Sequence, residues 1–389
     1  MDAGKPKASP GEGQEAKALS TNGRRCSRWL NSAAAMVWSV PEVNLFIMTD
    51  LRWGILGTGR IAGIFSRGVR ASQTGRLAAV GSRTRAAADR FASEFGVARA
   101  HGSYEELLAD REVQAIYVAT PHTLHAEWTI RAVQAGKHVL CEKPLTLNHA
   151  QAVPVVEAAR AAGVLLMEAF MYRCHPQTAK VVELVKSGAL GCVGLVQATF
   201  GFQRPFDPAV RLWNRALGGG GILDVGCYPV SFARLIAGAM DGQPFADPVS
   251  FSGAGYLHPV SGVDVYAAGT LRFANAMVAQ VACSIGLVQD CSARVYGSEG
   301  WLHVPEPWIS TRDGGTSFLF LHRPGASAPE KIAITAAPLY ALEADAFAAA
   351  LAAGWRDVPQ MTVADTLGNM TVLDQWRSAV GLVYDVEKT

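Results

Sequence analysis

The strongest constraint on the fold is an alternation of short apolar strands and helix-periodic segments from Leu51 to about Phe170. The expected strands read LRWGILG, GRLAAVGS, AIYVAT, HVLCEK and VLLMEAF. Strands that alternate with helices in units this short form a parallel, doubly wound α/β sheet. The sequence therefore predicts a first domain of this kind over residues 48–171.

The pattern changes after about Tyr172, where a helix, a strand and a glycine-rich loop are followed mainly by strands. Between roughly residues 250 and 335 we expect strands at DVYAAGTLRFA, MVAQVACSI, ARVYGS, GWLHV, ISTRD and KIAIT, separated by short turns. Two helices near 339–353 and 363–380 end the chain. This predicts an α+β domain over residues 172–389, built on a large open, mostly antiparallel sheet.

The first 47 residues differ in composition, being rich in Gly, Pro, Lys, Ala and Ser. Such a segment buries too little apolar surface to fold alone, so we expect a disordered or spurious extension. Arg24 and Arg25 precede a short apolar run, as in a twin-arginine export signal, but Cys-Ser-Arg follows where an apolar residue belongs. The seven cysteines are odd in number and form no CxxC, which favours reduced thiols in a cytoplasmic protein.

The charge balance excludes some classes of partner. The formal net charge is +2, and neither a run of like charges nor an apolar run of about 18 residues occurs. A nucleic-acid or membrane-surface role usually requires a basic patch. We therefore expect a small-molecule substrate, with no nucleic acid and no membrane.

The stretch GILGTGRIA places Gly57, Gly59 and Ala62 at G-x-G-x-x-A spacing between a strand and a helix. The first glycine allows a tight turn, the second lets the backbone approach a pyrophosphate, and the helix N-terminus favours that anion. This context predicts a Rossmann dinucleotide site, with Thr58, Arg60 and Ile61 in the same loop. A glycine-rich turn without a ligand is the alternative.

The end of the second strand reads GSRTR, with Ser82 and Arg83 where an NAD-specific site places a carboxylate. A serine and an arginine suit a 2′-phosphate, which favours NADP(H) over NAD(H). The alternative is that Arg83 is an ordinary solvated residue.

Two further strand ends are predicted to meet at the ligand-binding edge of the sheet. They contribute Thr120, Pro121, His122 and His125 from one strand, and Glu142, Lys143 and Pro144 from the next. A lysine beside a nicotinamide can hold a substrate hydroxyl, although a charge pair at a strand end is usually only solvated. No role for Glu142 follows from the pattern.

Together, GILGTGRIA, VATPHTLHAEWTIRAVQAGKHVLCEKPLTL and MEAFMYRCHPQ resemble the Gfo/Idh/MocA oxidoreductases over residues 51–389. The resemblance implies a Rossmann domain followed by an open-sheet domain, assembly as a homodimer or higher homo-oligomer, and a catalytic role for Lys143.

Asp224 and Tyr228 lie four residues apart in LGGGGILDVGCYPV and share a face if the segment is helical. This stretch resembles the branch holding glucose-fructose oxidoreductase, dimeric dihydrodiol dehydrogenases and NADP-dependent D-xylose dehydrogenases. The resemblance implies that Tyr228 is the general acid/base, that Lys143 lowers its pKa from about 10, and that Asp224 binds substrate or orients the pair. A core tyrosine and a helix N-cap are the alternatives.

Five further residues are predicted to line the substrate pocket, with ordinary packing as the alternative: Tyr172, Arg173, His175, Trp213 and Asn214. The histidines show no metal-ligand spacing, so we predict no metal. The resulting prediction is an NADP-dependent oxidoreductase acting on a sugar or cyclic diol, first of all an aldose 1-dehydrogenase. A trans-1,2-dihydrodiol dehydrogenase and a keto-sugar reductase come next. Rivals from other classes are a non-catalytic nucleotide-binding protein and a redox-neutral glycosidase.

Overall fold

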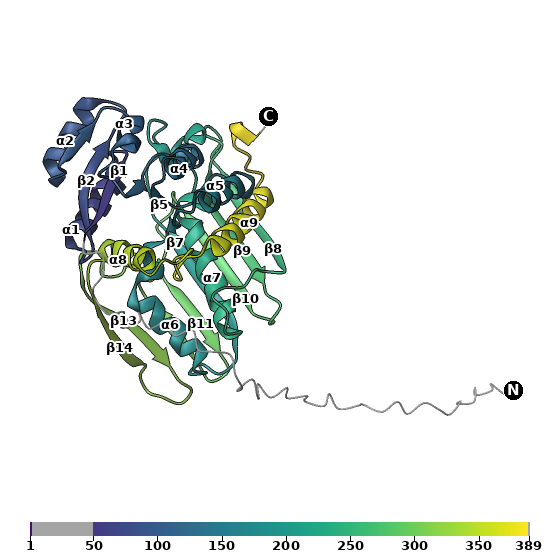
Figure 1. Ribbon diagram of the computed structural model, residues 1–389. Coiled ribbons are helices and arrows are strands. Elements are labelled where there is room, and N and C mark those ends of the chain that lie inside the picture. The colour runs from purple at the N-terminus through teal and green to yellow at the C-terminus, as the bar shows by residue number, and fades with distance from the viewer. Residues whose placement is uncertain (2–49, 388–389) are drawn as a thin grey trace. The chain divides into compact units, whose positions relative to one another are not determined.

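The computed structural model describes Met1 and residues 50–387 (Figure 1). The predictions of a disordered or spurious extension and of an export-like segment therefore fall, apart from Met1, outside the described residues. Residues 50–387 belong to one compact unit. It contains a six-stranded and an eight-stranded sheet.

The six-stranded sheet is parallel throughout, which confirms the predicted doubly wound fold. Its strands lie in the spatial order β3-β2-β1-β4-β5-β6. The strand order reverses between β1 and β4, and ligands bind at such a switch point, beyond the carboxyl ends of the strands. The strands are β1 (Leu51–Leu56), β2 (Gly75–Gly81), β3 (Arg99–His101), β4 (Ala115–Val118), β5 (His138–Glu142) and β6 (Leu166–Ala169).

Helices from both halves of the chain cover this sheet. On one face, Phe65 of α1 stacks on Tyr117 of β4, with ring centroids 3.8 Å apart. Helices α4 and α5 pack against each other, and α4 also contacts β4 and β5. The helices in this part are α1 (Arg60–Ala71), α2 (Arg85–Phe95), α3 (Tyr104–Ala109), α4 (His125–Gln134) and α5 (His149–Ala162).

The eight-stranded sheet has the order β14-β13-β12-β11-β7-β10-β9-β8. Only β7 and β10 pair in parallel, so the expected mostly antiparallel sheet is confirmed. Its strands are β7 (Val193–Gly201), β8 (Ser250–Leu257), β9 (Asp264–Arg272), β10 (Val278–Ser284), β11 (Ala293–Gly297), β12 (Gly300–Val304), β13 (Gly315–His322) and β14 (Glu330–Ala336).

The predicted strand ISTRD is wrong. Residues 309–313 form a turn in which Thr311 has φ = 43°, a left-handed conformation that a strand cannot contain. The strand begins only at Gly315, and its alternating burial follows the pattern in TSFLFLH. Isoleucine and threonine favoured a strand locally, but the turn takes precedence because it reverses the chain so that β13 pairs antiparallel with β12.

Helices α6 (Pro176–Lys186) and α7 (Cys227–Met240) pack together, and α7 lies on β7 and β10. The stretch Arg215–Met240 is long and apolar enough to cross a membrane, but 94% of its most apolar window is buried inside the protein. A core helix of a folded domain has this character. The other face of the sheet is more open, and a depression there is lined by polar residues that include Gln197, Thr199, Thr270, Gln280 and Arg294.

The last two helices, α8 (Leu339–Ala352) and α9 (Val363–Ala379), return to the six-stranded sheet. Helix α8 packs on α1 so closely that a Cβ on Gly68 would lie 2.4 Å from the Tyr340 Cβ. The Asp345 carboxylate accepts hydrogen bonds from the backbone of Gln73 and Thr74. Helix α9 contacts α5, α7 and β6. The two sheets therefore share helices instead of each having a separate set.

Candidate active site

The loop between β1 and α1 has the shape that a dinucleotide requires. Gly57 has φ = 106°, and a Cβ there would lie 2.9 Å from the carbonyl oxygen of Ala119. Gly59 precedes α1 without any side-chain cap, and a Cβ there would meet no atom within 4 Å. The first N–H groups of α1, which begins with Arg60 and Ile61, therefore face open space and fit a pyrophosphate.

The end of β2 supplies polar groups beside this loop. The hydroxyls of Thr58 and Ser82 lie 3.2 Å apart. Arg83 is exposed, and its positive charge opposes the rise that burial causes in the pKa of Tyr104. No carboxylate occurs between Gly81 and Arg85. A serine and an exposed arginine therefore occupy the strand end where NAD-specific sites have a carboxylate that binds the ribose.

Lys143 follows directly on β5 and precedes Pro144 across a cis peptide bond. Its ammonium donates a hydrogen bond to the backbone oxygen of Asp224 at 2.6 Å and lies 4.0 Å from the Asp224 carboxylate. The same ammonium lies 5.2 Å from the ring centre of Tyr228. The structure thus brings together the three residues predicted to be catalytic, although Lys143 follows a strand of the parallel sheet and the other two lie in and just before α7.

The backbone around Lys143 is held by side chains that are at least nine-tenths buried. Consecutive residues are bound in turn: Glu142 accepts from the Lys143 N–H, His125 Nδ1 lies 2.8 Å from the Pro144 oxygen, and Glu168 accepts from the Leu145 N–H at 2.9 Å. Such contacts limit the directions in which the lysine side chain can leave the sheet.

Two residues predicted to contact the cofactor are occupied elsewhere. His125 is fully buried, with its nitrogens against the carbonyl oxygens of Pro144 and Thr120. Glu142 accepts a hydrogen bond from the buried hydroxyl of Tyr117. Both side chains therefore bind groups inside the protein and stabilise the ends of the strands. His122, in contrast, turns toward the second sheet, where its Nδ1 lies 2.9 Å from the Gly218 oxygen.

Arg211 is a site residue that the sequence interpretation missed. Its guanidinium donates to Asp224 Oδ1 at 2.5 Å and lies 3.3 Å from His122 Nε2. Burial alone would raise the pKa of Asp224, but the charges of Arg211 and Lys143 outweigh burial and lower it. Asp224 is therefore an anion between two cations. The only sequence signal was a lone arginine two residues before Trp213.

The environment of Tyr228 differs from the one that the resemblance implied. Its hydroxyl points to Met171 Sδ at 3.4 Å, and four aromatic rings surround it: Phe170, Tyr172, Phe200 and Trp308. Burial, followed by nearby Tyr340 and Cys227, raises the pKa of Tyr228 well above 10. Burial therefore outweighs any lowering of this pKa by the Lys143 ammonium, and the expected low pKa is not found in this structure.

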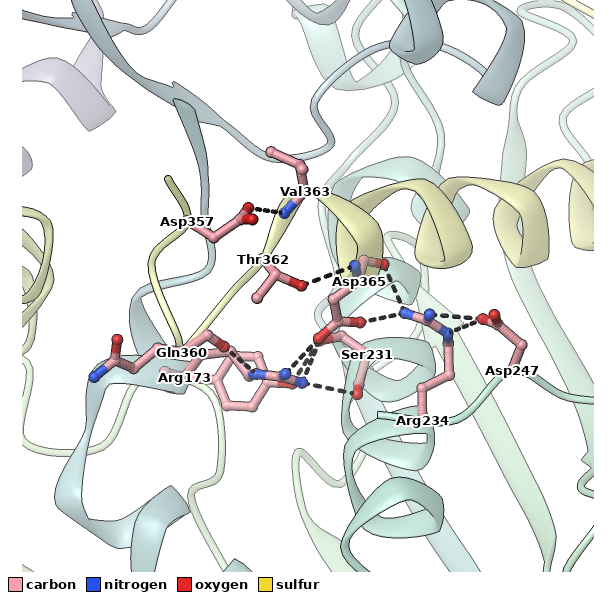
Figure 2. Close-up of polar contacts among 10 residues, drawn as sticks. Arg173, Ser231, Arg234, Asp247, Asp357, Gln360, Thr362, Val363 and Asp365 are labelled. Carbon is pink, nitrogen blue, oxygen red and sulfur yellow. Dashed lines mark hydrogen bonds and ion pairs between the residues drawn. The ribbon is translucent and has the colours of Figure 1, made fainter. Parts of the chain in front are cut away.

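The predicted substrate residues are engaged within the protein. Figure 2 shows the guanidinium of Arg173 enclosed by Asp365, Ser231 and the backbone of Gln360. Arg173 is 3% exposed, and its guanidinium is committed to these internal partners. Ion pairing with a buried carboxylate from α9 explains its position.

Three of the other four are also internal, and Asn214 is half-buried. Tyr172 donates to Ser231 and is 1% exposed, and His175 caps α6. Trp213 is 3% exposed and packs on Phe206. Asn214 accepts a hydrogen bond from a nearby backbone N–H. Packing, the alternative left open by the sequence, describes their present contacts better than a pocket lining does.

A dinucleotide loop and a lysine at the switch-point edge, facing a carboxylate and a tyrosine from a second domain, define a nucleotide-dependent oxidoreductase. A family model for oxidoreductases with an NAD-binding Rossmann fold, Gfo/Idh/MocA, matches residues 51–170. The model of the Gfo/Idh/MocA C-terminal domain matches residues 178–303. The chain belongs to the Gfo/Idh/MocA oxidoreductase family.

Relatives of known name are similar over most of the chain. A D-xylose 1-dehydrogenase (NADP(+)) of Haloferax volcanii is 36% identical over 83% of this chain and 95% of its own length. A trans-1,2-dihydrobenzene-1,2-diol dehydrogenase of mouse is 35% identical over 67% of this chain and 76% of its own length.

Solved structures have the same fold. The 3-ketoreductase KijD10 of Actinomadura kijaniata, solved with NADP and TDP-benzene, matches with a TM-score of 0.77 and 29% identity, over 85% of this chain and 98% of that one. The aldose-aldose oxidoreductase of Caulobacter crescentus matches with a TM-score of 0.76 and 27% identity, again over 85% and 98%.

Proposed function

We propose that this protein is an NADP-dependent oxidoreductase acting on a carbinol or hemiacetal carbon, first of all as an aldose 1-dehydrogenase. The observation that carries the proposal is the position of the Lys143 ammonium, at the carboxyl end of β5 and beside Asp224 and Tyr228. When bound, the nicotinamide supplies or accepts the hydride. The names of the similar proteins support a sugar or diol as substrate.

Three side chains of the protein bind the substrate and transfer the proton. The Lys143 ammonium holds the reacting oxygen by charge and hydrogen bonding. Asp224, kept ionised by Arg211 and Lys143, accepts hydrogen bonds from substrate hydroxyls. Tyr228 exchanges the proton with the reacting oxygen once its hydroxyl turns from Met171, because it is the titratable hydroxyl closest in sequence and space to this pair.

A second candidate, reduction of a keto-sugar, is favoured by one observation. The raised pKa keeps Tyr228 protonated, and a neutral phenol is ready to donate a proton to a carbonyl oxygen. Oxidation requires the same group to accept a proton. Measuring kcat in both directions with one sugar and its keto or lactone partner separates the two candidates.

We propose that NADP(H) is preferred, supported by Ser82 and Arg83 at the end of β2. Arg83→Ala should raise the Kd of NADPH about tenfold, as expected for loss of a charge-assisted hydrogen bond, while the Kd of NADH changes less than twofold. Arg85→Ala is a matched control, because Arg85 pairs with Asp89 on the surface. Equal losses for both cofactors in Arg83→Ala would reject the 2′-phosphate role.

The test of the proposed function is NADP⁺ reduction by the purified protein against a panel of aldoses, polyols and trans-diols. Lys143→Met and Tyr228→Phe should each lower kcat by about 10²-fold or more. Wild-type rates in both variants would overturn the site assignment. Cleavage of a glycoside without net change in free cofactor would favour the redox-neutral glycosidase instead.

We also propose a homo-oligomer in which the open face of the eight-stranded sheet is covered by a second copy. The polar depression on that face supports an interface with many hydrogen bonds. Light scattering of the purified protein at several concentrations tests this assembly, and a monomer at all of them would reject it.

A further inference from the structure

Glu168 is a buried carboxyl group in the middle of an apolar strand. It is 1% exposed, and its Oε1 accepts a hydrogen bond from the Leu145 N–H at 2.9 Å. Its other oxygen, Oε2, has no hydrogen-bond partner. A buried acid that leaves one oxygen unpaired is destabilising, so its presence requires a reason. The residue that it contacts, Leu145, lies two positions after Lys143.

A second element reaches the same carboxyl group. Thr366, in the first turn of α9, lies beside Glu168, and its hydroxyl opposes the rise that burial causes in the pKa of this carboxyl group. Its neighbour Asp365 binds Arg173 and Arg234, as Figure 2 shows, which fixes this end of α9. Glu168 therefore connects the segment that carries the lysine to a helix anchored by ion pairs.

We propose that Glu168 is a positioning residue for Lys143. By holding the Leu145 N–H, it fixes the backbone after Pro144 and so the direction in which the ammonium approaches Asp224. This inference rests on the proposed function. Glu168 touches neither the reacting oxygen nor the cofactor loop, and it acts only through the backbone.

The charges around Glu168 make this contact sensitive to pH. Burial raises its pKa to about 7, while the Thr366 hydroxyl and the hydrogen bond from Leu145 oppose the rise. Asp365 raises this pKa further, and Arg234 lowers it. The other titratable groups facing it, the thiols of Cys141 and Cys227, are neutral because burial raises their pKa. As pH rises through 7, Glu168 becomes an anion and a stronger acceptor for Leu145.

Hydrogen exchange of the Leu145 amide tests the contact without any assay of activity. Glu168→Leu should speed this exchange at least tenfold at pH 8, and Glu168→Gln should speed it less, since the amide oxygen still accepts a hydrogen bond. Thr366→Val provides a second variant if Glu168→Leu does not fold, and it should also speed the exchange. An unchanged rate in every folded variant would overturn the inference.

Kinetics test the consequence for Lys143. The kcat of Glu168→Leu should fall about 30-fold and that of Glu168→Gln about 3-fold, with KM and the Kd of NADPH changing less than threefold. The kcat of the wild-type protein should increase as pH rises through 7, because Glu168 becomes a stronger acceptor. This increase should be absent in Glu168→Gln. It should be present in Glu343→Gln, a matched change of another buried glutamate. If the increase persists in Glu168→Gln, the positioning role is wrong. If Lys143→Met has wild-type activity, the proposed function fails instead, and hydrogen exchange still decides the contact.

Discussion

Two charged clusters with buried members differ in how their charges are compensated. The arginine cluster consists of Arg173, Arg234, Asp365 and Asp247, in which each guanidinium faces a carboxylate. The acid cluster consists of Glu142, Glu343, Tyr117 and Tyr340, whose charges would all be negative. In the first cluster, opposite charges compensate burial. In the second, burial raises the pKa of each acid.

The two clusters therefore differ in how pH affects the charges of their members. In the acid cluster, burial first and Glu142 second raise the pKa of Glu343, and neither oxygen of Glu343 has a hydrogen-bond partner. Burial also raises the pKa of Glu142, although Lys143 opposes the rise. Stability should therefore depend on pH through the acid cluster.

Asp365→Ala should have the largest effect, since it leaves the buried Arg173 guanidinium without a carboxylate and Arg234 with only the exposed Asp247. Removing one partner of a buried ion pair typically costs about 3–5 kcal/mol of unfolding free energy. Urea denaturation measures the loss, which should be similar at pH 6 and pH 8 because arginine remains charged at both. A loss below about 1 kcal/mol would show that the cluster is not a stabilising core element.

Glu343→Gln should remove a pH dependence. Above its ordinary pKa of 4.5, Glu343 loses its proton in the unfolded chain but retains it in the folded protein, so wild-type stability falls as pH rises from about 5 toward the raised folded pKa. The variant should reduce this slope by up to about 1.4 kcal/mol per pH unit. Denaturation at pH 5, 6.5 and 8 measures the slope. The exposed Glu94→Gln is the control, and equal slopes in all three proteins would contradict the assignment.

Asp247→Asn should have the smallest effect. The Asp247 side chain is 60% exposed, although it contacts the fully buried Arg234. Exposed ion pairs contribute about 0–1 kcal/mol because water screens them. In thermal melting, Asp247→Asn should lower the Tm by only a few degrees, which is less than the decrease for Asp365→Ala. A loss as large as that of Asp365→Ala would mean that both carboxylates of the cluster are equally needed.

The sequence predicted the parts of the site that follow from local rules. Gly57 and Gly59 lie in a strand-turn-helix context that only a few conformations satisfy, and Lys143 lies at the end of a buried strand. Parallel strands deliver their carboxyl ends to one edge, so the location of Lys143 could be predicted without knowledge of the second domain. The second sheet followed from another local signal, the short turns that separate its strands.

The remaining parts depend on contacts between distant residues, which periodicity does not encode. Arg211 meets His122 across 89 positions, and Arg173 meets Asp365 across 192. The direction of the Tyr228 hydroxyl depends on rings from β7 and from the turns at Met171 and Trp308. Glu168 did carry a local signal, since an acidic residue inside an apolar strand requires a partner.

The anchoring of α9 has a consequence for synthesis of the chain. Lys143 and the nucleotide loop leave the ribosome long before Asp365 and Thr366, which hold Arg173 and Glu168. A nascent chain can thus form the parallel sheet while the support of its lysine is still missing. Competence for catalysis should arise last, and a chain that stops before Val363 should retain a dinucleotide loop without an ordered lysine.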